Sequence, residues 1–261
     1  MEKIISRDGT PIAFYRSGIG SPLVLVHGTG AADPTAWPAF PVLEKRFSVI
    51  TIDRRGRGQS GDDSAYTIER EFEDIAAVVE AIGESVDLLG HSFGGLLALE
   101  AAMLTQSVRK LVLYEGILLP AEMVPEAAIE RLQALLDAGD LEGVLTTHYR
   151  DNAGLSPDQI EQMKSSLSWP ARLASAHTVP REQRALRSYR FDPDHFRDMQ
   201  TPTLLLLGGD SPQFVKDATE RIDRELRNSQ VVILPGQQHV AMYTAPELFV
   251  NELVRFLVEP S

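Results

Sequence analysis

The residues best suited to chemistry in this chain are a serine and the two glycines that bracket it, in Gly90-His91-Ser92-Phe93-Gly94. A short apolar run typical of a buried strand comes directly before them, and small apolar residues that favour a helix come directly after. This pattern predicts a tight strand-to-helix turn that strains the backbone at Ser92, where larger residues in place of Gly90 and Gly94 would collide. A serine on such a turn can act as a nucleophile, provided that a base and oxyanion donors lie beside it.

Two residues in the second half of the chain could supply the base and its acid. Asp210 follows the apolar run 203–207, and His239 lies in the loop after the run 231–234. If these runs are parallel strands, their carboxyl ends meet at one edge of the sheet, where Ser92 also lies. The residues occur in the order serine, acid, histidine, so we predict a catalytic triad of Ser92, His239 and Asp210.

The elements that must position these residues alternate between strands and helices. Residues 3–16 are typical of an antiparallel hairpin at a sheet edge. Further strands are predicted at 23–26, 49–52, 86–89, 109–115, 203–207 and 231–234, with helices at 68–82, directly after Ser92, at 212–227 and near the end through 258. The apolar runs are continuous, as in parallel strands that are buried on both faces. We therefore predict an α/β fold, with a mostly parallel β-sheet and helices on both faces.

A long segment between two of the predicted strands carries only helical patterns. Helices are expected at 125–138, 141–149 and 156–167, with shorter pieces after them. An insertion of this size is best explained as a lid over the site. The predicted organisation is a core domain of residues 1–116 and 200–261, with a helical cap at 117–199.

Composition excludes several classes of function. A formal charge of -12 leaves no broad basic surface for nucleic acid, and we expect the one basic run, Arg54-Arg55-Gly56-Arg57, to be a solvated loop. The acids within 69–74 are expected to form a solvated helix face, and the absence of cysteine excludes thiol chemistry. No apolar signal core or membrane-length apolar run is present. We expect a cytoplasmic protein with a small-molecule substrate and no nucleic-acid or membrane partner, and the sequence leaves homodimer formation open.

A dinucleotide-binding loop is the main rival interpretation of the segment after the strand 23–26. Gly28-Thr29-Gly30 follows that strand, and Asp53 closes the next one, as a ribose-binding acid would. The third glycine of the pattern is missing, because Asp33 stands in its place and Pro34 follows. A carboxylate there would repel a pyrophosphate. No spacing typical of metal ligands occurs either, so we expect no cofactor and no metal.

Together these motifs resemble the α/β-hydrolase fold superfamily, in particular its lid-bearing serine hydrolases of the esterase and lactonase kind. The likeness covers nearly the whole chain and rests on His27-Gly28, Asp53-Arg54-Arg55-Gly56-Arg57-Gly58-Gln59-Ser60, Gly90-His91-Ser92-Phe93-Gly94 and Pro235-Gly236-x-x-His239. It implies that Ser92 is the nucleophile and His239 the general base. It also implies an oxyanion hole made by the backbone amides of Thr29 and Phe93.

The resemblance implies a cofactor-independent hydrolase that cleaves a small carboxylic ester, thioester or lactone through an acyl-enzyme. The same residues can also hydrolyse carbon–carbon bonds in diketone-type compounds or carry out perhydrolysis, so the sequence leaves these reactions open. A ligand receptor with slow turnover on the same scaffold is a further alternative.

The acid and the remaining histidines have alternatives too. Glu115 ends the strand 109–115, and its longer side chain could reach His239 in place of Asp210. His91, beside Ser92, is expected to be structural, and His27 is expected to shape the oxyanion loop. His148 and His177 lie on the insertion, where a surface or packing role is favoured over a substrate contact.

Overall fold

The structure is a computed structural model, and it describes residues 1–32, 37–116, 118 and 121–259. Asp33 and Pro34, at the position of the missing third glycine, lie outside these residues. Within the described ranges, eight strands form one sheet in the order β1-β2-β4-β3-β5-β6-β7-β8. Their bounds are β1 Glu2–Ile5, β2 Pro11–Gly18, β3 Ser21–Val26, β4 Phe47–Ile52, β5 Val86–His91, β6 Val108–Tyr114, β7 Thr203–Gly208 and β8 Ser229–Leu234.

All strands from β3 to β8 run parallel, and the hairpin of β1 and β2 adds two antiparallel strands at one edge. The helices are α1 Phe40–Leu43, α2 Ile68–Ala81, α3 Phe93–Leu104, the 3-10 turn η2 Ala121–Met123, α4 Glu126–Asp137, α5 Leu141–Asp151, α6 Pro157–Lys164, α7 Trp169–Ala174, α8 Thr178–Ser188, α9 Pro193–Phe196, α10 Gln213–Glu225, α11 Ala241–Thr244 and α12 Pro246–Val258. The predicted α/β fold is confirmed.

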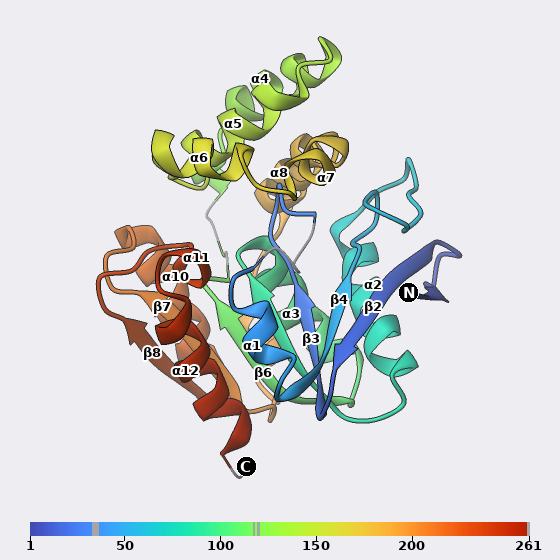
Figure 1. The fold of residues 1–261 in the computed structure, drawn as a ribbon, viewed down its shortest axis with the longest axis vertical. Helices are drawn as coiled ribbons and strands as arrows, with labels where there is room; N and C mark the ends of the chain where they lie inside the picture. Colours follow the sequence, from blue (N-terminus) through green and yellow to red (C-terminus); the bar gives the residue numbers. More distant parts are fainter. Residues whose placement is uncertain (33–36, 117, 119–120, 260–261) are drawn as a thin grey trace.

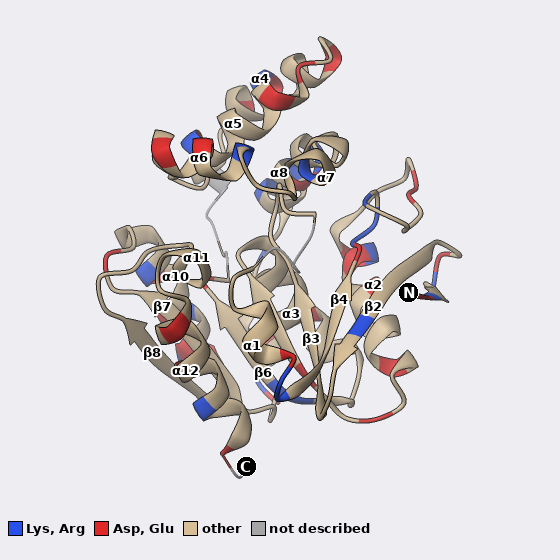
Figure 2. Ribbon diagram, viewed as in Figure 1, with Lys and Arg blue, Asp and Glu red and all other residues tan. Residues whose placement is uncertain are grey.

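The side chains of the central strands alternate between two buried layers, one on each face of the sheet. On β3, Val24 and Val26 pack into the layer that α2, α3 and α10 cover. Leu23 and Leu25 pack into the opposite layer. Figure 1 shows α1 and α12 on that face of the sheet. Figure 2 shows that acidic and basic residues lie mainly on the helices and loops around the sheet. Burial on both faces therefore explains the continuous apolar runs of the sequence.

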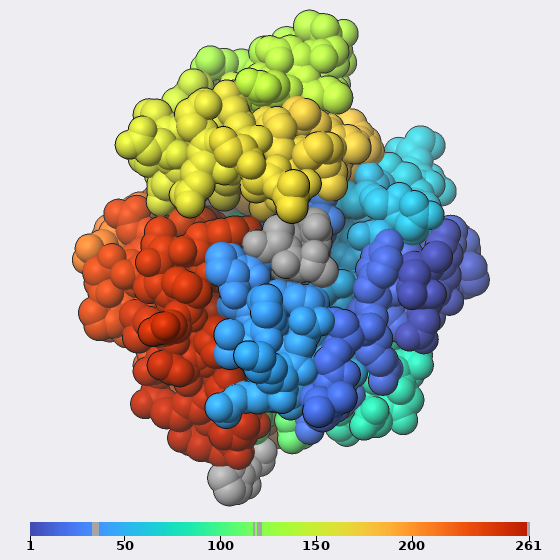
Figure 3. Space-filling model, in the orientation of Figure 1, coloured from blue at the N-terminus to red at the C-terminus, as the bar shows by residue number. Residues whose placement is uncertain are grey.

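The helices α4 to α9 all lie between β6 and β7 in the sequence, as an insertion into the sheet (Figure 1). Figure 3 shows this insertion, in green to gold, lying across the rest of the molecule. Its apolar residues, among them Leu132, Leu145 and Ile160, join the same buried layer that α1 and α12 cover. The insertion is thus packed on the core through a continuous apolar interior.

The basic run that was expected to be a solvated loop is instead buried and paired, so this expectation is wrong, and the acidic run is solvated only in part, because Glu71 and Asp74 are buried while Glu69 is exposed. Arg54 and Arg55 are at most 1% exposed. Arg54 forms an ion pair with Glu71 at 2.7 Å, and Arg55 forms one with Asp74 at 2.7 Å. The loop after β4 lies against α2, so its arginines and the acids of α2 are counter-charges for each other. The paired hydrogen bonds offset the cost of burying these charges.

Among the described residues, no helix is both long and apolar enough to cross a membrane.

Candidate active site

Ser92 lies at the turn between β5 and α3, in a backbone conformation that L residues seldom adopt. Its φ is 57° and its ψ is −126°. A Cβ on Gly90 would lie 2.3 Å from the carbonyl oxygen of Gly94, and a Cβ on Gly94 would lie 2.4 Å from that of Val26. Both distances are too short for a side chain. The strained turn predicted from the glycine spacing is confirmed.

His239 follows β8, and its partner in the structure is Glu115, not Asp210. The Nδ1 atom of His239 lies 2.7 Å from Oε2 of Glu115. The other carboxylate oxygen, Oε1, accepts hydrogen bonds from the amide of Gly208 at 2.9 Å and from the hydroxyl of Ser211 at 2.5 Å. Glu115 is 1% exposed and has a positive φ of 45°, so a second strained residue lies beside the site.

The expectation that Asp210 pairs with His239 is wrong. Asp210 is exposed, and its amide donates to the carbonyl of Gln237 at 2.9 Å. The chain turns tightly after β7, where the amide of Ser211 donates back to the carbonyl of Gly208 at 3.1 Å. This short turn brings Ser211 inward to Glu115 and leaves Asp210 on the outside.

The environment of Glu115 favours its ionised form. Burial by itself would raise the pKa of this carboxyl. Hydrogen bonds from His239, Ser211 and the amide of Gly208, with the charge that His239 can carry, outweigh burial and leave the pKa below its ordinary value of 4.5. Glu115 is therefore an anion that can hold a proton on Nδ1 of His239.

Residues at the ends of two strands hold the loop that carries His239. His91 of β5 donates from Nε2 to the carbonyl of His239 at 2.9 Å and stacks on Tyr114, with ring centroids 5.2 Å apart. The hydroxyl of Tyr114 donates to the carbonyl of Gln238 and accepts from the amide of Ala241 at 2.8 Å. Burial keeps the pKa of His91 well below 6.5, so its ring is neutral. This agrees with the structural role that was expected of His91.

Thr29 and Phe93 line the same cavity as Ser92 and His239, which is about 180 Å³ in volume. The loop that carries Thr29 is held through its carbonyl groups. Arg54 donates to the carbonyls of His27 and Gly28 at 3.3 and 3.4 Å. His27 itself is buried, and its Nδ1 donates to the carbonyl of Gly28 at 3.0 Å. These bonds fix the backbone next to Ser92, which agrees with the expectation that His27 shapes this loop.

The insertion is tied to the same loop by a buried carboxylate. Glu182 of α8 is completely buried and accepts hydrogen bonds from Arg54, at 3.1 Å, and from Arg57. Arg57 also donates to the carbonyl of Ala31 at 3.1 Å. Burial opposes ionisation of Glu182, but the charges of the two arginines hold its pKa well below its ordinary value. Glu182 was not among the predicted site residues, because its partners lie far away in the sequence.

Side chains of the insertion form the other wall of the cavity. His148 and Tyr149 of α5, together with Arg172 of α7, line it. His148 is not a surface residue, because it is only 5% exposed, and burial lowers its pKa to about 4. Trp169 is buried behind Tyr149, with ring centroids 6.5 Å apart. The insertion therefore contributes directly to the space beside Ser92.

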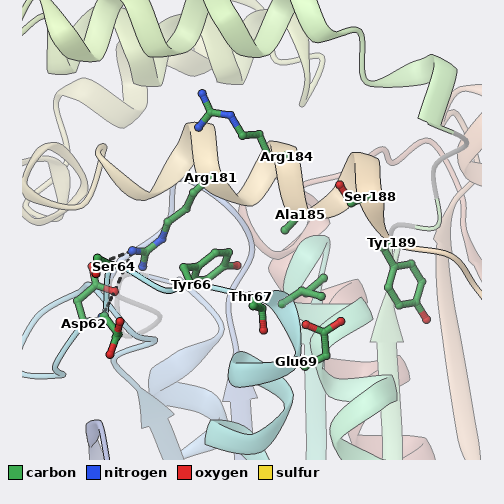
Figure 4. A pocket seen from close by; sticks show the side chains of 12 residues that line it. Asp62, Ser64, Tyr66, Thr67, Glu69, Arg181, Arg184, Ala185, Ser188 and Tyr189 are labelled. Atoms are coloured by element: carbon green, nitrogen blue, oxygen red, sulfur yellow. Dashed lines mark hydrogen bonds and ion pairs between the residues drawn. The ribbon is translucent and has the colours of Figure 1, made fainter. Parts of the chain in front are cut away.

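A second cavity, about 710 Å³ in volume, opens between α8 and the segment 62–69 (Figure 4). Figure 4 shows Arg181 reaching from α8 toward Asp62, to which it donates two hydrogen bonds of 2.8 Å. The lining residues include Tyr66 and Glu69 but no histidine in the part of the chain that the structure describes. The described lining of this cavity offers no histidine to activate Ser64 or Ser188, whereas a serine and a histidine line the cavity at Ser92 together.

Across the described ranges, no group of three or more His, Cys, Asp or Glu side chains could hold a metal ion. The chemistry on offer is that of a serine, a histidine and a carboxylate, with backbone amides beside them.

Comparison with known proteins gives a consistent picture. Residues 23–252 match the sequence model of the alpha/beta hydrolase family. The chain is 25% identical to (E)-2-((N-methylformamido)methylene)succinate hydrolase of Acinetobacter baylyi, over 94% of this chain and 93% of that protein. It is 27% identical to 2-hydroxy-6-oxo-2,4-heptadienoate hydrolase of Pseudomonas putida, over 91% and 87% of the two chains. The crystal structure of an alpha/beta hydrolase from Sphaerobacter thermophilus superposes with a TM-score of 0.84 at 34% identity, covering 98% and 100% of the two chains.

Proposed function

Because this chain belongs to the alpha/beta hydrolase family, we propose that it is a cofactor-independent serine hydrolase that cleaves a small carboxylic ester, thioester or lactone. The observation that carries the proposal is the hydrogen bond between the buried Glu115 and His239, which lines the same cavity as Ser92 on its strained turn. A base oriented by an anion, beside a serine, is the arrangement that makes a hydroxyl nucleophilic.

In this mechanism, the Oγ of Ser92 attacks the carbonyl carbon of the substrate while Nε2 of His239 takes the hydroxyl proton. Glu115 accepts the hydrogen bond from Nδ1, keeps the proton on that nitrogen and stabilises the imidazolium that forms. His239 then gives its proton to the leaving alcohol, thiol or ring oxygen. In the second half, His239 deprotonates water, the hydroxide attacks the acyl carbon, and the carboxylic acid leaves as Ser92 regains its proton.

The developing oxyanion is assigned to the backbone amides of Thr29 and Phe93. Both residues line the cavity with Ser92, and Phe93 is the first residue of α3, where the helix dipole favours negative charge. Arg54 and Arg57 support this assignment, because they hold the carbonyls on either side of Thr29 and so fix the direction of its amide. We assign the insertion, predicted as residues 117–199, the role of a cap that selects the substrate.

A second candidate is hydrolysis of a carbon–carbon bond next to a ketone on the same residues. The likeness to a hydrolase of a 6-oxo-dienoate along nearly the whole chain favours it. The attack of Ser92 and the oxyanion are the same in both reactions. The leaving group is then a carbanion, which takes the proton that His239 received from Ser92.

The proposal is tested by two measurements on the same preparation. A fluorophosphonate probe should label the wild-type protein at Ser92 and leave Ser92→Ala unlabelled. A panel of nitrophenyl esters, thioesters, lactones and 1,5-diketones should then show rapid multiple turnover of one class, which Ser92→Ala loses. Labelling that persists in Ser92→Ala would refute the nucleophile, and single turnover on every compound would favour a receptor.

A further inference from the structure

The wall of the active-site cavity contains an arginine whose charge has no acidic partner among the described residues. Arg172 of α7 is 4% exposed and lines the cavity with Ser92. Its hydrogen bonds all go to neutral oxygens: the hydroxyl of Ser168 at 3.3 Å, the carbonyl of Gly30 at 3.2 Å, the hydroxyl of Tyr149 at 3.1 Å and that of Tyr243 at 3.2 Å.

The other deeply buried arginines behave differently. Arg54, Arg55 and Arg57 are each at most 2% exposed, and each contacts a carboxylate. The ion pairs found in the described ranges do not include Arg172. Burying a guanidinium without a counter-charge is costly, and an anion bound beside it would lower that cost. A protein with a net charge of -12 nevertheless keeps this one at the reaction site.

The remaining charged groups of the cavity do not neutralise it. Asp151 is the one carboxylate among the described lining residues, and its side chain is 38% exposed and pairs with Arg150 at 2.6 Å. Burial lowers the pKa of both His91 and His148, which keeps these two rings neutral. The anion Glu115 makes its ion pair with His239, so Arg172 remains a positive charge of this cavity without a carboxylate partner among the described residues.

The guanidinium also has hydrogen-bonding capacity to spare. It carries five N–H groups, and its four hydrogen bonds leave at least one of them without an acceptor among the described residues. A free N–H lies on Nη2, the nitrogen whose one hydrogen bond goes to Tyr243. The bonds to Gly30 and Tyr149 hold the plane of the guanidinium rigidly, so a ligand need not order this side chain.

We propose that Arg172 binds a carboxylate of the substrate. This inference rests on the proposed function and narrows it: the substrate is a small acyl compound that carries an ionised carboxylate away from the bond that Ser92 attacks. A cavity of about 180 Å³ suits a compound of a few carbons between the two groups. A free N–H and a buried positive charge together recognise a carboxylate in preference to its neutral ester.

The test compares two substrates that differ in one charge. Mono-4-nitrophenyl glutarate carries a free carboxylate, its methyl ester carries none, and both release 4-nitrophenolate. With spontaneous hydrolysis subtracted, the wild-type protein should favour the charged ester in kcat/KM by about 30-fold or more. Arg172→Gln should bring this ratio to one or below, and Arg172→Lys should restore part of it. Arg184→Gln, which removes an exposed arginine of the same insertion, should leave the ratio unchanged.

The ratio separates charge recognition from general damage to the site. A wild-type protein without preference for the charged ester, or an Arg172→Gln protein that slows both esters equally, would overturn the proposal. If Arg172→Gln does not fold, the proposal is tested by inhibition of the wild-type protein. Glutarate should inhibit hydrolysis of the neutral ester at a concentration at least about 30-fold lower than dimethyl glutarate does. Equal inhibition by the two compounds would overturn the proposal.

Failure of the proposed function has a different signature. If Ser92 is not labelled and neither ester is hydrolysed, the hydrolase mechanism fails. Calorimetric binding of glutarate and of dimethyl glutarate to Ser92→Ala then still decides whether Arg172 holds a carboxylate. Preferential binding of glutarate supports the site, and its absence refutes it.

Discussion

Replacing Glu115 with glutamine tests the central geometry of the site, because it removes one charge and keeps the shape of the side chain. In the wild type, Oε1 accepts from the amide of Gly208, and Oε2 accepts from Nδ1 of His239. The carboxamide oxygen of Gln can keep the bond to Gly208, which turns its NH₂ group toward His239. Nδ1 must then accept, so the ring proton moves to Nε2, the atom that has to take the proton of Ser92.

The size of the effect follows from the two orientations of the amide. With the wrong tautomer, the loss is about 10⁴-fold, as in the best-studied serine triad, which corresponds to about 5.5 kcal/mol of activation free energy. The flipped amide would present its oxygen to His239 but its NH₂ group to the Gly208 amide, at a cost of about 1–3 kcal/mol for the lost bond. The hydroxyl of Ser211 can rotate and adapt. We therefore expect a loss of about 10²- to 10⁴-fold in kcat/KM.

The matched control is Asp210→Asn, which removes one charge from an exposed carboxylate in the next loop. Its kcat/KM on a nitrophenyl ester should stay within about twofold of wild type, since surface substitutions have small effects. Thermal unfolding of both variants establishes that they are folded. A large loss in Asp210→Asn together with near-normal activity in Glu115→Gln would refute the reasoning, and the acid would then be Asp210.

The difference in stability between the wild type and Glu115→Gln is predicted to depend on pH. The pKa of Glu115 is lowered in the folded state, so its ionised form stabilises the fold above the unfolded value of about 4.5. This contribution is lost as the pH falls below that value. The free energy of unfolding of wild type relative to Glu115→Gln, measured in urea, should therefore be greatest near pH 7 and shrink toward pH 3. A difference that grows toward acid pH would contradict the ionised assignment.

Four further substitutions test other parts of the site. Gly94→Val should lower the midpoint of thermal unfolding more than Ser92→Ala does, because its Cβ would lie 2.4 Å from a carbonyl oxygen, and equal midpoints would contradict the strained turn. Glu182→Gln leaves two buried guanidinium groups without their shared anion. Urea unfolding should therefore show that the free energy of unfolding falls by about 3–5 kcal/mol, and the ester assay should show a lower kcat. A fall of less than about 1 kcal/mol would mean that these ion pairs do not hold the insertion on the core. Tyr149→Ala should change the relative rates on short and long acyl esters, since Tyr149 lines the cavity, whereas Trp169→Ala, buried behind it, should mainly reduce stability. Uniform loss on all esters in Tyr149→Ala would mean that it only supports the fold.

The sequence by itself determined the features that depend on neighbours in the chain. The turn at Ser92 follows from Gly90 and Gly94, because the contacts that exclude a Cβ arise from the turn itself and the strand beside it. The continuous apolar runs determined the parallel sheet, since only strands covered on both faces can carry them. The place of His239 in a loop after a strand followed from the same reasoning.

The choice of the acid could not be made that way, and only the tertiary structure decided it. Glu115 and His239 are separated by 124 residues, and their contact depends on how tightly the chain turns after β7. That turn places Ser211 inward and Asp210 outward, a difference of one residue that composition does not encode. Local spacing ranks both acids as candidates, because both follow strands that end at the same edge of the sheet.

Burial of charge was decided by the tertiary structure for the same physical reason. Arg54 is 17 residues from Glu71 and 128 residues from Glu182 in the sequence. The sequence of the basic run therefore does not indicate that its counter-charges come from two helices elsewhere in the chain. Local composition predicts solvation, because an unpaired charge belongs in water. Pairing reverses that preference, and pairing is a property of the folded chain.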